Sequence, residues 1–158
     1  MSQIKVIRVD LCNHHHTEAM MEICDAYARD PMGMNEGLSE GTKANLVEEL
    51  RYFPTTLCFL AYLDDKPVGI ANGFYGFSTF KGKKLINIHD LAVMPEARGQ
   101  GIGEALLQAV EDKARMMDCC KVTLEVREDN RARRLYERFG FTYGDPAMYF
   151  MTKELMKE

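Results

Sequence analysis

Residues 85–117 constrain the fold more than any other segment, because their hydrophobic pattern changes from that of a strand to that of a helix across a glycine-rich loop. The segment 85–93, which is rich in aliphatic residues, predicts a long strand. Apolar side chains at i, i+3 and i+4 over 102–117 predict the clearest helix in the chain. The loop between them holds Gly99, Gly101 and Gly103. We therefore expect a strand, a sharp turn and a helix in direct succession.

The glycine-rich loop has the composition of a phosphate-binding site. Glycine lets the backbone approach a ligand closely, and the first turn of a helix offers free N–H groups at the positive end of its dipole. Arg98 adds a charge and a fork of donors. Glu104 stands where a dinucleotide-binding G-x-G-x-x-G needs its third glycine, and the G-K-[ST] of a P-loop is absent. The remaining pattern is Arg98-x-x-Gly101-x-Gly103 after a strand.

The composition excludes several classes of protein. A chain of 158 residues suits one globular domain. The balance of 20 basic and 24 acidic residues, net −4, excludes a dedicated nucleic-acid binder. A hydrophobic fraction of 46% excludes intrinsic disorder, and no apolar run approaches the ~20 residues of a membrane span. Without the apolar core of a signal peptide and with an odd number of cysteines, the chain is expected to be cytoplasmic with reduced thiols.

Periodicity and turn residues predict the remaining elements. The expected strands are 4–9, 57–63, 68–75, 121–126 and 148–151, and the expected helices are 17–29, 43–52 and 131–139. Asn130 is the predicted cap of the last helix and Gly140 its end. No linker, repeat or low-complexity tract interrupts the chain, so we expect one α/β domain over residues 1–158.

Three consecutive histidines at 14–16, next to Cys12, suggest a metal site. Consecutive residues of a helix point in different directions, so these side chains cannot all bind one ion. We therefore expect a solvated helix start and no metal.

Two motifs resemble those of one known family. The pattern Arg98-x-x-Gly101-x-Gly103 resembles the acyl-CoA pyrophosphate loop of the GCN5-related N-acetyltransferase (GNAT) superfamily. Residues 130–141 are similar to that family's N-x-x-A-x-x-x-Y-x-x-x-G-F element, although Ala132 lies one place earlier than in the family pattern. The order of the expected elements also matches. The resemblance covers nearly the whole chain and is strongest over 85–141.

The resemblance implies a mixed central sheet flanked by helices, an α/β (α+β) fold. Its parallel strands 85–93 and 121–126 would splay apart to form the acyl-CoA cleft, with Asn130 reaching the pantetheine arm from one side. The family positions that would pair with pantetheine fall on Leu91, Ala92 and Val93. The positions around the pyrophosphate fall on Arg98, Gly99, Gln100, Gly101, Ile102, Gly103 and Glu104. From the basic run that follows Asn130, Arg133 is the residue chosen to contact a CoA phosphate.

Acetyl transfer to an amine needs a proton acceptor for the amine, a donor for the carbonyl oxygen and a proton for the departing thiolate. The phenol of Tyr136 can protonate a thiolate when contact geometry helps, and the resemblance implicates the same residue. The alternative is that Tyr136 only packs against the sheet. A main-chain N–H near residues 91–93 is the natural donor to the oxyanion.

The base is left open between His89 and Asp90. Strand alternation predicts that Asn87 and His89 share one face and that Asp90 lies on the other. Residues 87–93 are similar to a strand of arylalkylamine acetyltransferases in which two histidines stand two apart, but Asn87 replaces the first. His89 either accepts a proton through water or only forms a hydrogen bond inside the sheet. Asp90 either competes as the base or holds the ammonium.

These inferences predict a cytoplasmic N-acetyltransferase that moves an acetyl group from acetyl-CoA to a primary amine of a small molecule. A peptide or protein amine is the alternative acceptor, and a non-catalytic acyl-CoA-binding sensor or regulator is the alternative function. The family resemblance leaves a homodimer open. The side chains expected to frame the acceptor are Met32, Met34, Phe74, Tyr75, Phe77 and Phe80, with Asp30, Glu36 and Glu40 as attractors of a cation.

Overall fold

The computed structural model describes residues 2–156 of the chain. These residues form two compact units that meet in sequence between Leu124 and Glu125. The single domain expected over 1–158 stays a prediction.

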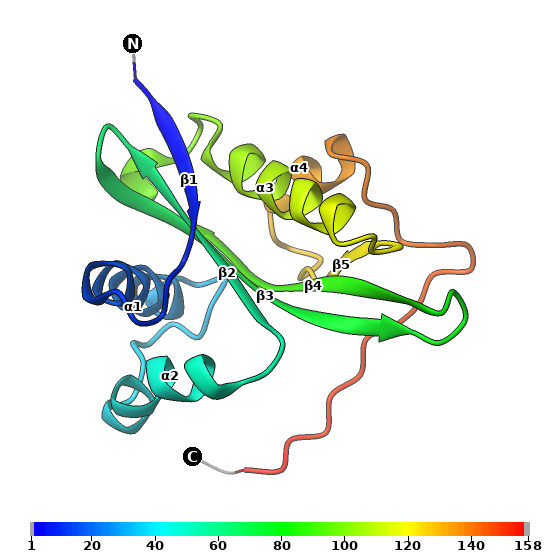
Figure 1. Ribbon diagram of the computed structural model, residues 1–158, viewed down its shortest axis with the longest axis horizontal. Coiled ribbons are helices and arrows are strands. Elements are labelled where there is room, and N and C mark those ends of the chain that lie inside the picture. The colour runs from blue at the N-terminus through cyan, green and yellow to red at the C-terminus, as the bar shows by residue number, and fades with distance from the viewer. Residues whose placement is uncertain (1, 157–158) are drawn as a thin grey trace. The chain divides into compact units, whose positions relative to one another are not determined.

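The N-terminal unit is built on a five-stranded sheet in the order β1-β2-β3-β4-β5 (Figure 1). The first four strands pair antiparallel, and β5 runs parallel to β4. This confirms the predicted mixed sheet. The strands are β1 Ile4–Arg8, β2 Thr56–Leu63, β3 Lys66–Ser78, β4 Lys83–Val93 and β5 Val122–Leu124.

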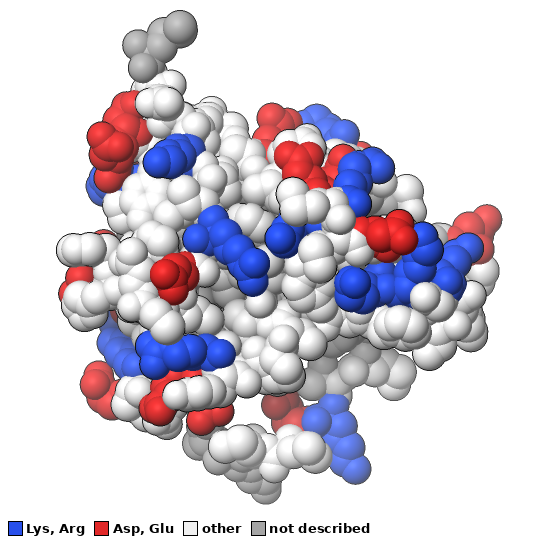
Figure 2. All heavy atoms as spheres, in the orientation of Figure 1, with Lys and Arg blue, Asp and Glu red and all other residues white. Residues whose placement is uncertain are grey.

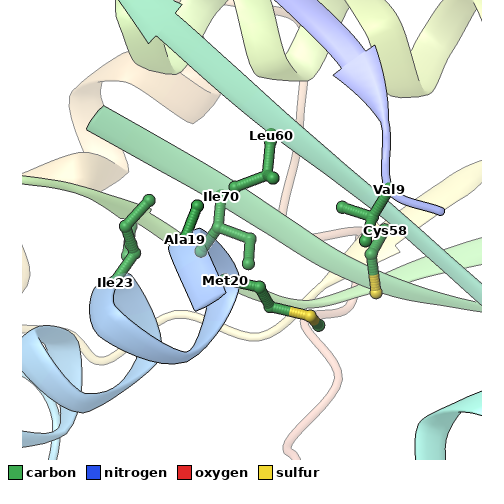
Figure 3. Close-up of a cluster of buried hydrophobic side chains, with 8 residues drawn as sticks. Val9, Ala19, Met20, Ile23, Cys58, Leu60 and Ile70 are labelled. Atoms are coloured by element: carbon green, nitrogen blue, oxygen red, sulfur yellow. The ribbon is translucent and has the colours of Figure 1, made fainter. Parts of the chain in front are cut away.

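Helices cover both faces of this sheet (Figure 1). The helix α3, Ile102–Met116, packs on one face through Ile102, Leu106, Leu107, Val110 and Ala114, all of which are buried. The helix α1, His14–Arg29, packs against β3 and β4 on the other face, and α2, Glu40–Tyr52, lies beside α1. Figure 3 shows Met20 and Ile23 of α1 next to Leu60 and Ile70 of the sheet. The core is therefore divided into two layers by the sheet.

Side-chain caps extend the first two helices beyond their predicted starts. The Asn13 side chain accepts hydrogen bonds from the N–H groups of His15 and His16, so α1 begins at His14 rather than at Thr17. Ser39 caps α2 in the same way. The ring of His16 is in turn engaged locally, since its Nδ1 accepts from the N–H of Asp10 at 2.9 Å.

A bulge in β4 changes which side chains share a face. Asn72 of β3 lies opposite Asp90, but the next residue of β3, Gly73, lies opposite Ile88, so His89 is the extra residue. Asn87 lies opposite Phe74, two residues from Asn72 on β3. Because directly opposed residues point to the same side of a sheet, Asn87 and Asp90 share one face. The prediction that Asp90 points away from Asn87 is wrong, because the bulge resets the alternation.

The C-terminal unit, residues 125–156, contains one short helix, α4, Ala132–Arg138. The Asn130 side chain accepts from the N–H of Ala132 at 2.9 Å, and Gly140 follows the helix with φ +104°. The predicted cap and stop are confirmed.

The strand predicted over 148–151 is wrong. These residues form no regular structure, and the side chains of Met148, Tyr149, Phe150 and Met151 are exposed to between 73% and 92%. The described residues of this unit include no strand, so the segment has no strand to pair with within the unit.

Candidate active site

The parallel pair β4–β5 is short and leaves part of β4 open. The paired residues are Ile86 with Val122, Asn87 with Thr123 and Ile88 with Leu124. Residues 89–93 of β4 have no partner on that edge among the described residues of the N-terminal unit. Their opposite edge is still paired to β3. The main chain of Leu91, Ala92 and Val93 is therefore paired with β3 on one edge, and its other edge has no strand partner among the described residues of this unit.

Asn87 lies in the middle pair of this short parallel ladder, one residue before the pairing ends at Ile88 and Leu124. Its Nδ2 donates to Oγ1 of Thr123, the residue opposite on β5, at 3.0 Å. The side chain of Asn87 therefore links β4 to β5 next to the point where their pairing ends.

The loop that follows β4 has the backbone geometry that a phosphate cradle needs. Gly99 and Gly101 adopt φ of +77° and +86°, which side chains strongly disfavour. No side chain caps α3, so the N–H groups of its first turn have no capping oxygen. Ile102 is 1% exposed and fixes the helix start on the sheet, so it offers a ligand only its main chain.

Arg98 is already engaged at this loop. Its Nη2 forms an ion pair with Asp30 Oδ2 at 3.0 Å, and its Nε donates to the carbonyl of Val93 at 3.2 Å. Hydrogen bonds from the Met32 N–H and from Arg98 lower the pKa of Asp30. Asp30 therefore binds Arg98 at the end of α1 rather than standing ready for a cationic acceptor. A narrow cleft beside this pair is lined by Tyr27, Val93 and Arg98.

Both candidate bases lie on the face of the sheet that carries α1. Asp90 is partly buried, and its Oδ2 lies 3.0 Å from Nδ2 of Asn72. His89 is exposed, and its ring stands 6.1 Å from that of Phe74 in an edge-to-face arrangement. Sequence reasoning missed Asn72. The available signal was one amide in the otherwise apolar run 68–75.

Two cysteines on the same face are poor nucleophiles at neutral pH. Burial raises the pKa of Cys24 to about 11 and that of Cys58 to about 12. Thiols with such pKa values stay protonated at neutral pH, and a protonated thiol is a poor nucleophile. Neither thiol is therefore suited to act as a catalytic nucleophile.

A cavity of about 540 Å³ opens where β1 and α2 meet the start of β2. Its floor includes Cys58, which lies opposite Asn72 in the β2–β3 ladder. The Phe53 ring at its edge stands 5.3 Å from Phe74. The cavity is thus one strand away from the pair Asn72–Asp90. Its polar lining includes Arg8, Asp10, Arg51 and Thr56.

The residues expected to frame an acceptor do not all gather there. Phe74 contacts both Phe53 and His89. Tyr75 lies opposite Ile86 and so points to the α3 face. Phe77 and Phe80 are exposed to 62% and 100% near the β3–β4 turn. Of these aromatic residues, the structure links only Phe74 with the candidate bases.

In the C-terminal unit, Tyr136 is 8% exposed and its ring lies 6.0 Å from that of Phe141. Arg133 donates to Tyr143 Oη at 3.0 Å and to the carbonyl of Glu128 at 2.7 Å. The roles expected for Tyr136, Asn130 and Arg133 remain predictions.

The chain also carries charged side chains and residue types that can bind a metal. Figure 2 shows Lys and Arg interspersed with Asp and Glu on the face that it draws. Within residues 2–156, no three His, Cys, Asp or Glu side chains are grouped so that they could hold a metal ion. No helix in that range combines the length and the apolar character needed to cross a membrane.

Comparison with known sequences gives one family. The profile described as the acetyltransferase (GNAT) family matches residues 19–141. Thialysine N-epsilon-acetyltransferase from Bos taurus is 38% identical over 74 residues, which are 46% of this chain and 43% of that protein. The match therefore spans less than half the length of this relative.

Solved structures share the fold. A probable acetyltransferase superposes with a TM-score of 0.81 at 22% identity, covering 97% of this chain and 99% of that chain. An aminoglycoside N-acetyltransferase in complex with CoA superposes with a TM-score of 0.76 at 15% identity, covering 97% of each chain. These likenesses establish the architecture, and the profile covers most of the sequence. The chain belongs to the acetyltransferase (GNAT) family.

Proposed function

We propose that the protein is an acetyl-CoA-dependent N-acetyltransferase that acts on a primary amine of a small molecule. The observation that carries this proposal is the open edge of β4 running directly into an uncapped helix start. An open strand edge suits the amides of pantetheine, and an uncapped helix start suits a pyrophosphate. The names of two similar proteins, which mention thialysine, aminoglycosides and CoA, support the same substrate classes.

The residues of the loop fit acetyl-CoA as a substrate. A Cβ built on Gly99 would meet no atom within 4 Å, so the loop surface is open to a ligand at that point. The main chain of 91–93 would pair with pantetheine, and the amides of 99–104 would surround the pyrophosphate. Arg98 has five N–H donors, so it can add one to the pyrophosphate while it keeps Asp30. Asn130 and Arg133 would contact the pantetheine arm and a CoA phosphate.

The proposed reaction is a direct attack. The acceptor ammonium gives a proton to Asp90 or His89, directly or through one water. The neutral nitrogen attacks the thioester carbonyl carbon, and a main-chain N–H near 91–93 donates to the oxygen that becomes negative. The C–S bond then breaks, and the thiolate takes the phenolic proton of Tyr136. The nitrogen loses its second proton, which returns to the Tyr136 phenolate, and the proton taken first by the base passes to solvent. The products are an N-acetylated amine and CoA, with one proton released to solvent.

The cavity beside Cys58 is the proposed acceptor site. It contains aromatic and charged side chains, and it lies next to the ladder row that holds Asn72 and Asp90. A small amine that enters there can reach the candidate bases. A peptide or protein amine is the second acceptor within the same chemistry.

Release of free thiol from acetyl-CoA, measured with a panel of amines, tests this function. The panel contains thialysine, an aminoglycoside, 2-phenylethylamine and a lysine-containing peptide. We expect turnover with one of the small amines. CoA binding without turnover of any amine would favour the non-catalytic sensor.

The role of Tyr136 is tested by Tyr136→Phe. We expect kcat to fall by about 10²-fold, because the thiolate loses its proton donor, with CoA affinity unchanged. Tyr149→Phe is the matched control, since Tyr149 is 92% exposed. Unchanged turnover of Tyr136→Phe would remove this residue from the mechanism.

The role of Arg98 is tested by calorimetry of CoA binding. We expect Arg98→Ala to raise the Kd by about ten-fold, because a charge-assisted contact to phosphate is lost. Arg115→Ala removes an exposed arginine from the other end of α3 and serves as the control. An equal Kd for Arg98→Ala and the parent protein would show that the pyrophosphate is bound elsewhere.

A further inference from the structure

Asn72 is an exception in the core of the N-terminal unit. It lies in the middle of β3 among Val68, Ile70 and Ala71, which are buried and apolar. It is 5% exposed, and Ser78 is the only other buried polar side chain among the described residues. A buried amide destabilises a fold unless all of its donors and acceptors are satisfied. Its presence there therefore calls for a physical reason.

The amide nitrogen of Asn72 has hydrogen-bond partners, but its amide oxygen has none among the described residues. Its Nδ2 donates to Asp90 Oδ2 at 3.0 Å and lies 3.4 Å from Cys24 Sγ. Its Oδ1 is buried and has no hydrogen-bond partner among the described residues. An orphaned carbonyl oxygen opposes stability, so the fold would be served better by an apolar side chain of this shape. The contact that the amide does make is to a candidate base.

The bulge at His89 creates this contact. It brings Asp90 directly opposite Asn72 and onto the same face, which a regular β4 would not do. The terminal torsion of an aspartate is soft, and a hydrogen bond from a buried amide restricts it. One carboxylate oxygen is then held, and the plane of the carboxylate is fixed. His89 has no such support, since its ring is exposed against Phe74.

We propose that Asn72 is a positioning residue for acetyl transfer, which holds the Asp90 carboxylate in the orientation that takes the proton of the acceptor amine. Asp90 is then the base and His89 is not. This inference rests on the proposed function. Asn72 touches no substrate, and it acts only through Asp90.

Asn72→Leu is the direct test, because leucine matches the shape of asparagine and removes both its donors and the orphaned oxygen. We use the panel amine with the highest turnover. We expect kcat to fall on the order of ten-fold, with the KM for acetyl-CoA unchanged. The Tm is expected to change little, because removal of the orphaned oxygen offsets the loss of the hydrogen bond to Asp90. Ser78→Ala, at the other buried polar residue of β3, is the matched control and should keep the parent kcat.

A double-mutant cycle separates positioning from a structural role. Asp90→Asn alone should lower kcat, while asparagine at 90 can still accept the hydrogen bond from Asn72. Adding Asn72→Leu to Asp90→Asn should change kcat by no more than about two-fold. A structural contribution of Asn72 would instead lower kcat by the same factor in both backgrounds, and that result would overturn the inference.

The remaining outcomes distinguish failure of this inference from failure of the proposed function. If Asp90→Asn keeps the parent kcat while His89→Gln loses it, Asp90 is not the base and the inference fails, although the enzyme activity stands. If no panel amine is acetylated by the parent protein, the proposed function itself fails. If Asn72→Leu does not fold, Asn72→Ser, which is smaller and cannot clash, takes its place with the same expectations for kcat and KM.

Discussion

The two faces of the sheet in the N-terminal unit differ in chemistry although they share the same strands. The α3 face is apolar, with Ile86 and Ile88 of β4 against Leu106 and other buried residues of the helix. The α1 face combines an apolar cluster with Asn72, Asp90 and the two buried thiols. One face is therefore apolar and mainly stabilises the fold, whereas the other accepts polar groups at some cost to stability. Under the proposed function, these polar groups take part in the reaction.

The largest expected effect is on the α3 face. Leu106 is fully buried, so Leu106→Ala should lower the free energy of unfolding by about 3 kcal/mol, through lost apolar burial and the cavity left behind. Urea unfolding measures this change. The kcat per folded molecule should stay at the parent value. A loss of kcat among the folded molecules would contradict the assignment of stability to the α3 face and of the proposed reaction to the α1 face.

A smaller effect is expected where the α3 face supports the loop. A Cβ at Gly69 would lie 2.8 Å from Cγ2 of Ile102 and 3.1 Å from Cδ1 of Leu106. Gly69→Ala should therefore destabilise by about 2 kcal/mol and push Ile102, the first residue of α3. The KM for acetyl-CoA should rise, because the loop amides move with that residue.

Gly76→Ala provides the control on the same strand. Its Cβ would meet only side-chain atoms of Leu85, the nearest at 3.1 Å, so that neighbour can give way. An equal rise in KM for both variants would show that the helix start does not transmit the change to the loop.

The smallest expected effect for a single side chain belongs to the α1 face and depends on pH. Burial raises the pKa of Cys24 from 9.0 to about 11 and that of Cys58 from 9.0 to about 12. Above pH 9 the unfolded thiols lose protons that the folded thiols keep, so stability is full below pH 9 and falls as pH rises toward 11. The expected loss is about 1 kcal/mol per pH unit for each thiol.

Urea unfolding at pH 8.5 and at pH 10 measures that loss. Cys58→Ala should show a shallower decrease than the parent protein, because one of the two thiols is absent. Cys12→Ala is the control, since Cys12 is exposed. A decrease of the same size in all three proteins would mean that the buried thiols do not cause it.

Local signals predicted the segment from β4 through α3 well. The strand, the positive-φ glycines and the helix follow each other as the pattern of apolar residues and glycines indicates. Two further predictions failed for physical reasons that no local pattern contains. The bulge at His89 is a property of the β3–β4 pairing, and the fate of residues 148–151 depends on whether a strand is available to pair with them.

The amino-acid sequence alone identified the family and predicted a phosphate-binding loop and two candidate bases, because each depends on residue types at short spacings. Tertiary structure alone decided that Asp90 shares a face with Asn87, and that Asn72 holds its carboxylate. The physical reason is that a β-ladder joins residues far apart in sequence, here 18 positions, and that one bulge in it reverses the side to which every later side chain points.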